Sequence, residues 1–208
     1  MDILPFITGG LLVAGALFLA ALFLRGAELP ACSDTVFGLS LIFIAIAQLG
    51  EWLLSGSLDQ DISTLNRMLQ NLALFTGIPL ISSTVFVAAF AWNPDKPAWG
   101  RWLLALLALF EVTRRAEAGT EYQAIMIALC ALALLLPALK GNTRLIFPCI
   151  GASLSLALSQ WSALQGYIDL TLFNALPSEL SPLFLIVSLA LSAYVLLNTL
   201  KTNQARYS

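Results

Sequence analysis

The hydrophobic positions of this chain fall into seven long runs, separated by polar or turn-forming segments that are short except for the mixed segment Gln165–Ser181. A helix needs about 20 consecutive apolar residues to cross a bilayer, and lipid offers no water to satisfy free backbone groups. Runs of this length therefore predict membrane-spanning helices. The seven predicted spans are Ile3–Leu24, Thr35–Leu54, Leu65–Trp92, Trp102–Gly119, Tyr122–Leu139, Leu145–Leu164 and Pro182–Leu200.

Local signals support several of these boundaries. Ser33 and Asp34 precede the second run, and both residue types cap helix N-termini. Gly77 and Pro79 lie in the middle of the third run and predict a kink there. The segment 93–97, with two prolines, predicts the turn that follows it.

The fourth run is the least regular, because Glu111, Arg114, Arg115 and Glu117 interrupt its second half. The basic residues test it independently, since cytoplasmic loops carry an excess of lysine and arginine. With the N-terminus outside, seven helices place seven of the ten basic residues on the cytoplasmic side. These seven are Arg25, Lys96, Arg101, Lys140, Arg144, Lys201 and Arg206.

Removing the fourth span would divide these basic residues between the two sides of the membrane, so the charge pattern favours keeping it. The sequence therefore predicts an all-α, polytopic membrane protein. We expect a bundle of seven transmembrane helices that forms a single domain over residues 1–208, with the N-terminus outside and the C-terminus cytoplasmic.

Composition agrees with this prediction. Hydrophobic residues make up 59% of the chain and charged residues 11%, whereas soluble domains carry roughly 25% charged residues. This balance excludes a soluble secreted domain and a nucleic-acid-binding protein, and indicates a multi-pass protein of a bacterial-type inner or plasma membrane. The chain has no histidine, which excludes histidine-ligated haem and zinc chemistry. Its three cysteines form no CxxC pair, so we expect no metal site and no cofactor.

Two membrane families offer a comparison for this layout. Seven helices with an outer N-terminus resemble the alkaline ceramidase type of lipid hydrolase in hydropathy, but that resemblance implies histidine ligands to zinc, which this chain lacks. A microbial-rhodopsin layout needs a retinal-binding lysine in the last helix, and the first lysine there, Lys201, follows its predicted end. Neither family is assigned.

The polar residues within the predicted helices gather at one depth, the outer half of the bundle. An ionisable group in the hydrocarbon costs on the order of 2.5–3.5 kcal/mol on insertion scales, so each needs a partner or a function. Residues three and four positions apart share a helix face, which groups several of these side chains. The candidates are Glu51 on the second helix, Arg67, Gln70 and Asn71 on the third, Glu111, Arg114 and Arg115 on the fourth, and Gln160 on the sixth.

The leading interpretation is a pocket that opens to the outer side and binds, or also transports, a small anionic or lipid-head-group ligand. The three arginines would contact the anion, because a planar guanidinium group can bind carboxylate or phosphate at two points. The two glutamates would balance their charge, and the amides would orient the ligand. The expected partners are membrane lipids and a small anionic or amphiphilic molecule, with no nucleic acid.

Three other interpretations stay open. The charges can form a structural ion-pair network between helices, or they can be buried against partner subunits of a larger membrane complex. Alternatively, Glu51 or Glu111 can serve as general acid or base on a lipid substrate. No nucleophile with a recognisable spacing supports catalysis, so the sequence favours binding over an enzyme and assigns no catalytic residue.

Overall fold

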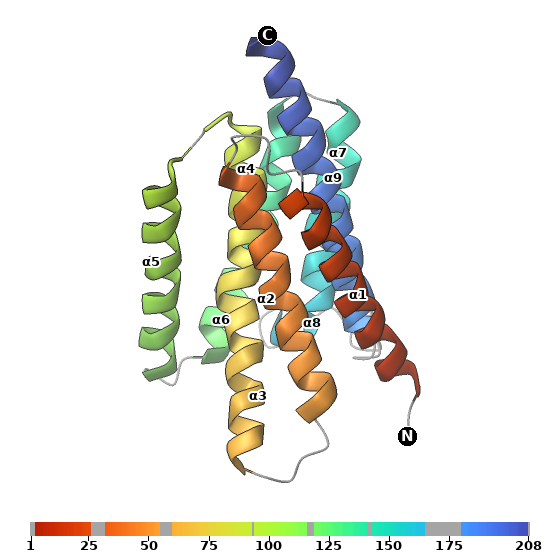
Figure 1. Ribbon diagram of the computed structural model, residues 1–208, viewed down its shortest axis with the longest axis vertical. Helices are drawn as coiled ribbons and strands as arrows, with labels where there is room; N and C mark the ends of the chain where they lie inside the picture. The colour runs from red at the N-terminus through yellow and green to blue at the C-terminus, as the bar shows by residue number, and fades with distance from the viewer. Residues whose placement is uncertain are drawn as a thin grey trace.

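A computed structural model of the chain is a bundle of α-helices (Figure 1). It describes residues 3–25, 32–54, 60–92, 94–115, 119–140, 143–164 and 180–207. The elements are α1 (Ile3–Arg25), α2 (Cys32–Leu54), α3 (Gln60–Leu72), the π-helical turn η1 (Ala73–Gly77), α4 (Ile78–Ala89), α5 (Lys96–Arg115), α6 (Gly119–Leu135), the 3₁₀ turn η2 (Leu136–Lys140), α7 (Thr143–Ser159), α8 (Trp161–Leu164) and α9 (Ser181–Tyr207).

These elements form seven helical rods, because α3, η1 and α4 are continuous, η2 extends α6, and α8 follows α7 after a one-residue turn. The rods run along one common axis and alternate in direction (Figure 1). Within the described residues, five rods are long and apolar enough to cross a membrane. Their apolar segments are Phe6–Arg25, Ser33–Glu51, Thr64–Ala89, Glu121–Leu139 and Ser181–Thr202. The all-α class and the seven predicted helices are confirmed.

The fourth rod begins earlier than predicted. Helix α5 starts at Lys96, six residues before Trp102, because the sequence provides an N-cap there: Ala98 N donates a hydrogen bond to Asp95 Oδ1 (3.0 Å). Pro97 is tolerated in this first turn, where a backbone N–H would have no intrahelical acceptor. At its other end α5 stops at Arg115, and Gly119 belongs to α6 instead of α5.

The predicted kink in the third rod is a π-helical turn. Ile78 N donates its hydrogen bond to Ala73 O, five residues back, in place of the usual four. Pro79 follows at once and has no N–H to continue the α-helical ladder. Ser82 Oγ donates a hydrogen bond to the carbonyl oxygen of Ile78 (3.1 Å), one turn earlier and beside the proline. The proline therefore disturbs the helix without ending it.

The core lies where α1, α2, α4, α6, α7 and α9 pack together. Ser188 and Ser192 of α9 are both buried, as expected for small residues that let helices approach closely. Ser188 Oγ also donates a hydrogen bond across the interface to Ala152 O of α7 (2.9 Å). Helix α5 differs from these helices in its position: it packs on the bundle mainly through η1 and α6, and it stands at one edge of the bundle (Figure 1).

Candidate functional site

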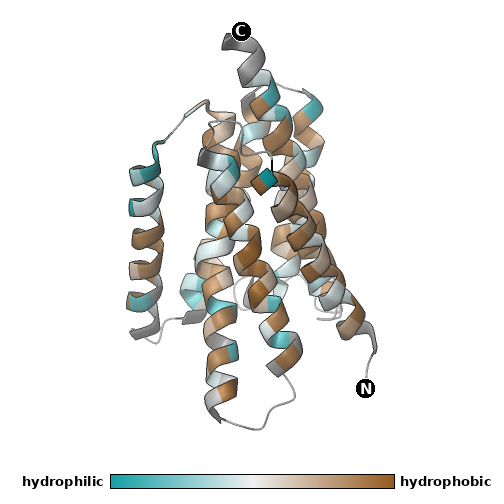
Figure 2. Cartoon of the chain, in the orientation of Figure 1, coloured by the Kyte–Doolittle hydropathy of each residue, from teal (hydrophilic) through white to brown (hydrophobic). Residues whose placement is uncertain are grey.

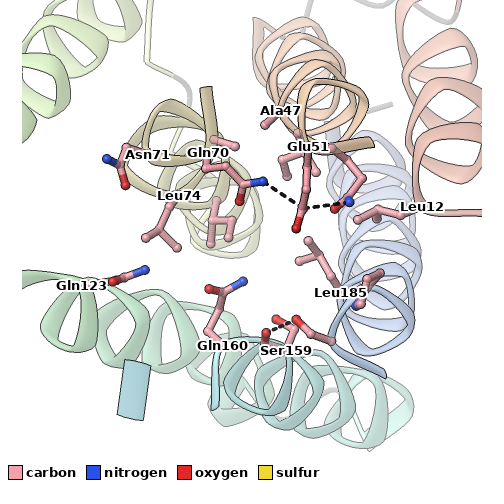
Figure 3. Close-up of a pocket in the computed structure, with 16 residues that line it drawn as sticks. Leu12, Ala47, Glu51, Gln70, Asn71, Leu74, Gln123, Ser159, Gln160 and Leu185 are labelled. Atoms are coloured by element: carbon pink, nitrogen blue, oxygen red, sulfur yellow. Dashed lines mark hydrogen bonds between the residues drawn. The ribbon is translucent and has the colours of Figure 1, made fainter. Parts of the chain in front are cut away.

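A polar cavity of about 320 Å³ opens at the end of the bundle where α2 ends and α9 begins (Figure 3). Six of the seven rods contribute to its wall, and none of the described side chains of α5 does. Its lining residues are Leu12, Ile44, Ala47, Gln48, Glu51, Gln70, Asn71, Ala73, Leu74, Ile78, Gln123, Ser159, Gln160, Ser181, Pro182 and Leu185. Amide and hydroxyl groups therefore meet at one depth above an apolar floor.

The carboxylate of Glu51 is the centre of one wall. Its Oε2 accepts a hydrogen bond from Gln48 Nε2 (3.0 Å), one turn earlier on α2, and another from Gln70 Nε2 (2.8 Å) on α3. Both are charge-assisted bonds, which are stronger than bonds between neutral groups. In Figure 3 the second carboxylate oxygen points away from these two amides, into the space between the helices.

The opposite wall is built from α6, α7 and the start of α9. Gln160 occupies the turn between α7 and α8, and Gln123 comes from α6, so two more amides face the Glu51 wall across the cavity (Figure 3). Ser181 Oγ donates to the backbone oxygen of Ser159, which ties the first residue of α9 to the last residue of α7.

Helix α1 supports the Glu51 wall from behind. A β-carbon at Gly9 would lie 3.3 Å from Gln48 Nε2, so the glycine lets the α1 backbone approach the amide that bonds Glu51. Leu12, one turn further along α1, is fully buried and forms part of the cavity floor with Leu185 of α9. Apolar side chains therefore lie beneath the polar groups of the Glu51 wall.

The structure brings together half of the residues that the sequence singled out. Glu51, Gln70, Asn71 and Gln160 all line the cavity. Glu111 lies on α5 and is not among the lining residues. The backbones of Arg67, Arg114 and Arg115 belong to α3 and α5, but their side chains lie outside the part of the chain that the structure describes, so their role stays a prediction.

Four polar lining residues were not among the predicted site residues: Gln48, Gln123, Ser159 and Ser181. Gln48 carried a signal, because it precedes Glu51 by three positions and shares its helix face. Gln123 lies near the start of the apolar run Tyr122–Leu139. A single amide there does not indicate which face of the helix points to the lipid and which points to the other helices. Ser181 falls immediately before the predicted seventh span, at the end of the mixed apolar and polar segment that separates this span from the sixth.

The described wall has a definite chemical character. Glu51 carries the only formal charge among the described lining residues, and the amides supply both donors and acceptors. Such a wall suits a ligand with a cationic or hydrogen-bond-donating group at Glu51 and acceptor oxygens opposite the amides. Among the described residues, no cluster of three or more cysteine, aspartate or glutamate side chains could hold a metal ion.

Comparison with known proteins finds no match for this chain among family models, curated proteins or solved structures. The interpretation of the cavity therefore depends on its own geometry.

Proposed function

We propose that the chain is an integral membrane protein whose seven rods all cross the bilayer, with the N-terminus outside and the C-terminus cytoplasmic. The alternating direction of the rods supports this topology. Helix α5 has an apolar middle between hydrophilic ends and lies parallel to its neighbours (Figure 2). Four basic residues lie at the end of the bundle opposite Glu51, namely Arg25, Arg101, Arg144 and Lys201. Cytoplasmic loops carry an excess of lysine and arginine, so this end is assigned to the cytoplasm.

In this membrane protein the Glu51 cavity binds a small ligand from the outer side. The convergence of one carboxylate and several amides from separate helices carries the proposal, because each such group costs free energy in the bilayer and a shared ligand can satisfy them together. A packing contact between two helices needs fewer polar groups than this. A cavity of about 320 Å³ is at the lower end of the usual range for small-molecule sites.

The ligand that fits best is a zwitterionic lipid head group or a free molecule with the same ammonium and phosphate groups. Its ammonium group contacts the carboxylate oxygen of Glu51 that the amides leave open. Its phosphate lies toward the predicted arginines, Arg67, Arg114 and Arg115. A purely anionic ligand depends on the arginines alone and gains nothing from Glu51. Binding is the proposed activity, and permeation coupled to binding is included in it.

Calorimetry on the purified protein in detergent tests this proposal. Glycerophosphoethanolamine is the probe, with glycerol phosphate as the anion that lacks the ammonium group and ethanolamine as the cation that lacks the phosphate. Glu51→Gln should weaken the probe's binding by about tenfold or more, because hydrogen bonds to charged groups contribute about 1.5–3 kcal/mol. Glu121→Gln is the matched control, since this exposed carboxylate at the start of α6 does not line the cavity.

Each outcome separates two interpretations. Equal binding by the wild type and Glu51→Gln would overturn the proposed role of Glu51, and preferential binding of glycerol phosphate would favour the purely anionic ligand. Arg114→Gln should lose the probe while the protein stays folded; loss of the fold without a separate effect on binding would instead indicate a structural ion-pair network. Phosphatidylethanolamine vesicles distinguish a membrane lipid from a free ligand, because only a lipid remains bound after extensive dialysis.

A further inference from the structure

A second cavity lies between α4, α5 and α6, and shares no lining residue with the Glu51 cavity. Its volume is about 580 Å³, and its walls are almost wholly apolar. Phe86 and Val87 form the α4 wall, Leu106 and Leu109 belong to α5, and Leu129 and Ala133 to α6. We call this space the α5 cleft. Its lining includes Trp92 and Pro94, between α4 and α5, at the end of the bundle that faces the cytoplasm in the proposed topology.

Two tryptophans at the α5 wall of the cleft differ in how their indole N–H groups are satisfied. Trp102 Nε1 donates a hydrogen bond to Ser83 Oγ on α4 (3.1 Å), which fastens the first half of α5 to the bundle. The side chain of Trp99 is only 6% exposed, and its Nε1 has no hydrogen-bond partner among the described residues. A buried N–H without an acceptor costs free energy, so this position favours a bound group that supplies one.

The surroundings of the cleft limit what can occupy it. A transmembrane helix is about 10–12 Å across. Such a helix does not fit between α5 and the bundle, because α5 still contacts η1 and α6 and is bonded to α4 through Trp102. The volume is instead within the range of about 300–1,000 Å³ that small ligands occupy.

The membrane itself supplies a molecule of the required chemistry. In the proposed topology, on which this argument depends, the cleft wall reaches from the interfacial tryptophans into the hydrocarbon. An acyl chain matches the apolar walls, and the ester group at its head lies at the depth where tryptophans gather in membranes. An ester carbonyl oxygen is a hydrogen-bond acceptor without charge, which suits a buried indole N–H.

We propose that the α5 cleft binds one phospholipid, with an acyl chain between α4, α5 and α6 and its ester carbonyl accepting a hydrogen bond from Trp99. The lipid completes the packing of α5 against the bundle. This site is separate from the Glu51 cavity in both position and chemistry, because it recognises an acyl chain and an ester, not a head group.

Native mass spectrometry tests the proposal on protein reconstituted into vesicles of phosphatidylethanolamine and phosphatidylglycerol and then transferred to detergent. The wild type should retain one phospholipid. Ala133→Phe fills the cleft from α6 and so displaces part of the acyl chain. The fraction of protein that retains a lipid should fall by about tenfold or more, because removing only two methylene groups of the acyl chain from the cleft already weakens binding by about that factor. Ala128→Phe is the matched control, because this exposed alanine lies on the same helix and does not line the cleft.

A second pair of measurements covers the case in which Ala133→Phe does not fold. Ala98→Phe fills the cleft from α5 and should give the same loss. Trp99→Phe keeps an aromatic ring in the wall but removes the N–H and one ring of the indole, so lipid exchange should accelerate by at least about three- to tenfold, the range that one hydrogen bond supports.

Equal retention by Ala133→Phe and Ala128→Phe would overturn the proposal, and so would a bound polypeptide that occupies the cleft in place of lipid. Failure of the Glu51 proposal is recognised separately. Glu51→Gln changes head-group binding at the other end of the bundle and should leave the phospholipid retained in the α5 cleft unchanged.

Discussion

The close approach of α2 to the π-helical turn depends on the absence of a side chain at Gly77. A β-carbon there would lie 3.1 Å from Ile44 Cγ1 and 3.3 Å from the backbone oxygen of Ser40. Favourable contacts between carbon atoms lie at about 3.5–4.0 Å, so Gly77→Ala brings two groups of α2 too close at once. The Ser40 oxygen belongs to the backbone and cannot rotate away.

Two opposing effects set the size of the change. Overpacking in a filled core costs about 1–3 kcal/mol, whereas replacing glycine by alanine within a helix contributes roughly 0.5–1 kcal/mol in favour of folding. We therefore expect Gly77→Ala to lower the free energy of unfolding by about 0–2.5 kcal/mol. Gly100→Ala on α5 is the control, because a β-carbon there would meet no neighbouring residue within 4 Å, so only the favourable helix effect remains.

Thermal unfolding followed by tryptophan fluorescence in one detergent measures both variants. The expected difference in stability between them is about 1–3 kcal/mol, with Gly100→Ala the more stable. If Gly77→Ala were stabilised as much as Gly100→Ala, the close packing of α2 on η1 would be refuted. The position of Glu51 on α2 relative to Gln70 on α3 would then be refuted as well, because α3 continues directly into η1.

Two further predictions concern contacts between helices. Ser188→Ala should lower the free energy of unfolding by about 0.5–1.5 kcal/mol, because Ser188 Oγ bonds Ala152 O across the interface. Ser192→Ala should be nearly neutral, since its buried hydroxyl has no hydrogen-bond partner among the described residues; equal losses would contradict this reasoning. Trp102→Phe removes the bond to Ser83 and should speed amide hydrogen exchange at the start of α5 by about three- to tenfold, whereas unchanged exchange would show that α5 is held by other contacts.

The sequence predicted the helices well, because a bilayer allows few alternatives to a long apolar helix. It placed the kink at Gly77 and Pro79, and the structure has a π-helical turn immediately before the proline. The early start of α5 was missed although Asp95 and Pro97 are ordinary signals for a helix N-terminus. Hydropathy did not register them, because charged residues at a helix end lower the apolar average.

The candidate site was predicted in part, for a physical reason. The rarity of polar groups within apolar runs indicates their depth in the membrane, and that was sufficient to identify Glu51, Gln70 and Gln160. Depth does not determine how each helix is rotated or which helices are neighbours. Glu111 shares the predicted depth but lies on α5, at the edge of the bundle and away from the cavity wall. Gln123 faces the cavity only because of the rotation of α6.

The most direct test of the central claim is an experimental density map of the protein in a lipid nanodisc with glycerophosphoethanolamine present. We expect density that belongs to no protein atom between Glu51, Gln123 and Gln160, within hydrogen-bond distance of the open carboxylate oxygen of Glu51. A cavity closed by direct pairing of Glu51 with an arginine, or filled by another polypeptide, would contradict it.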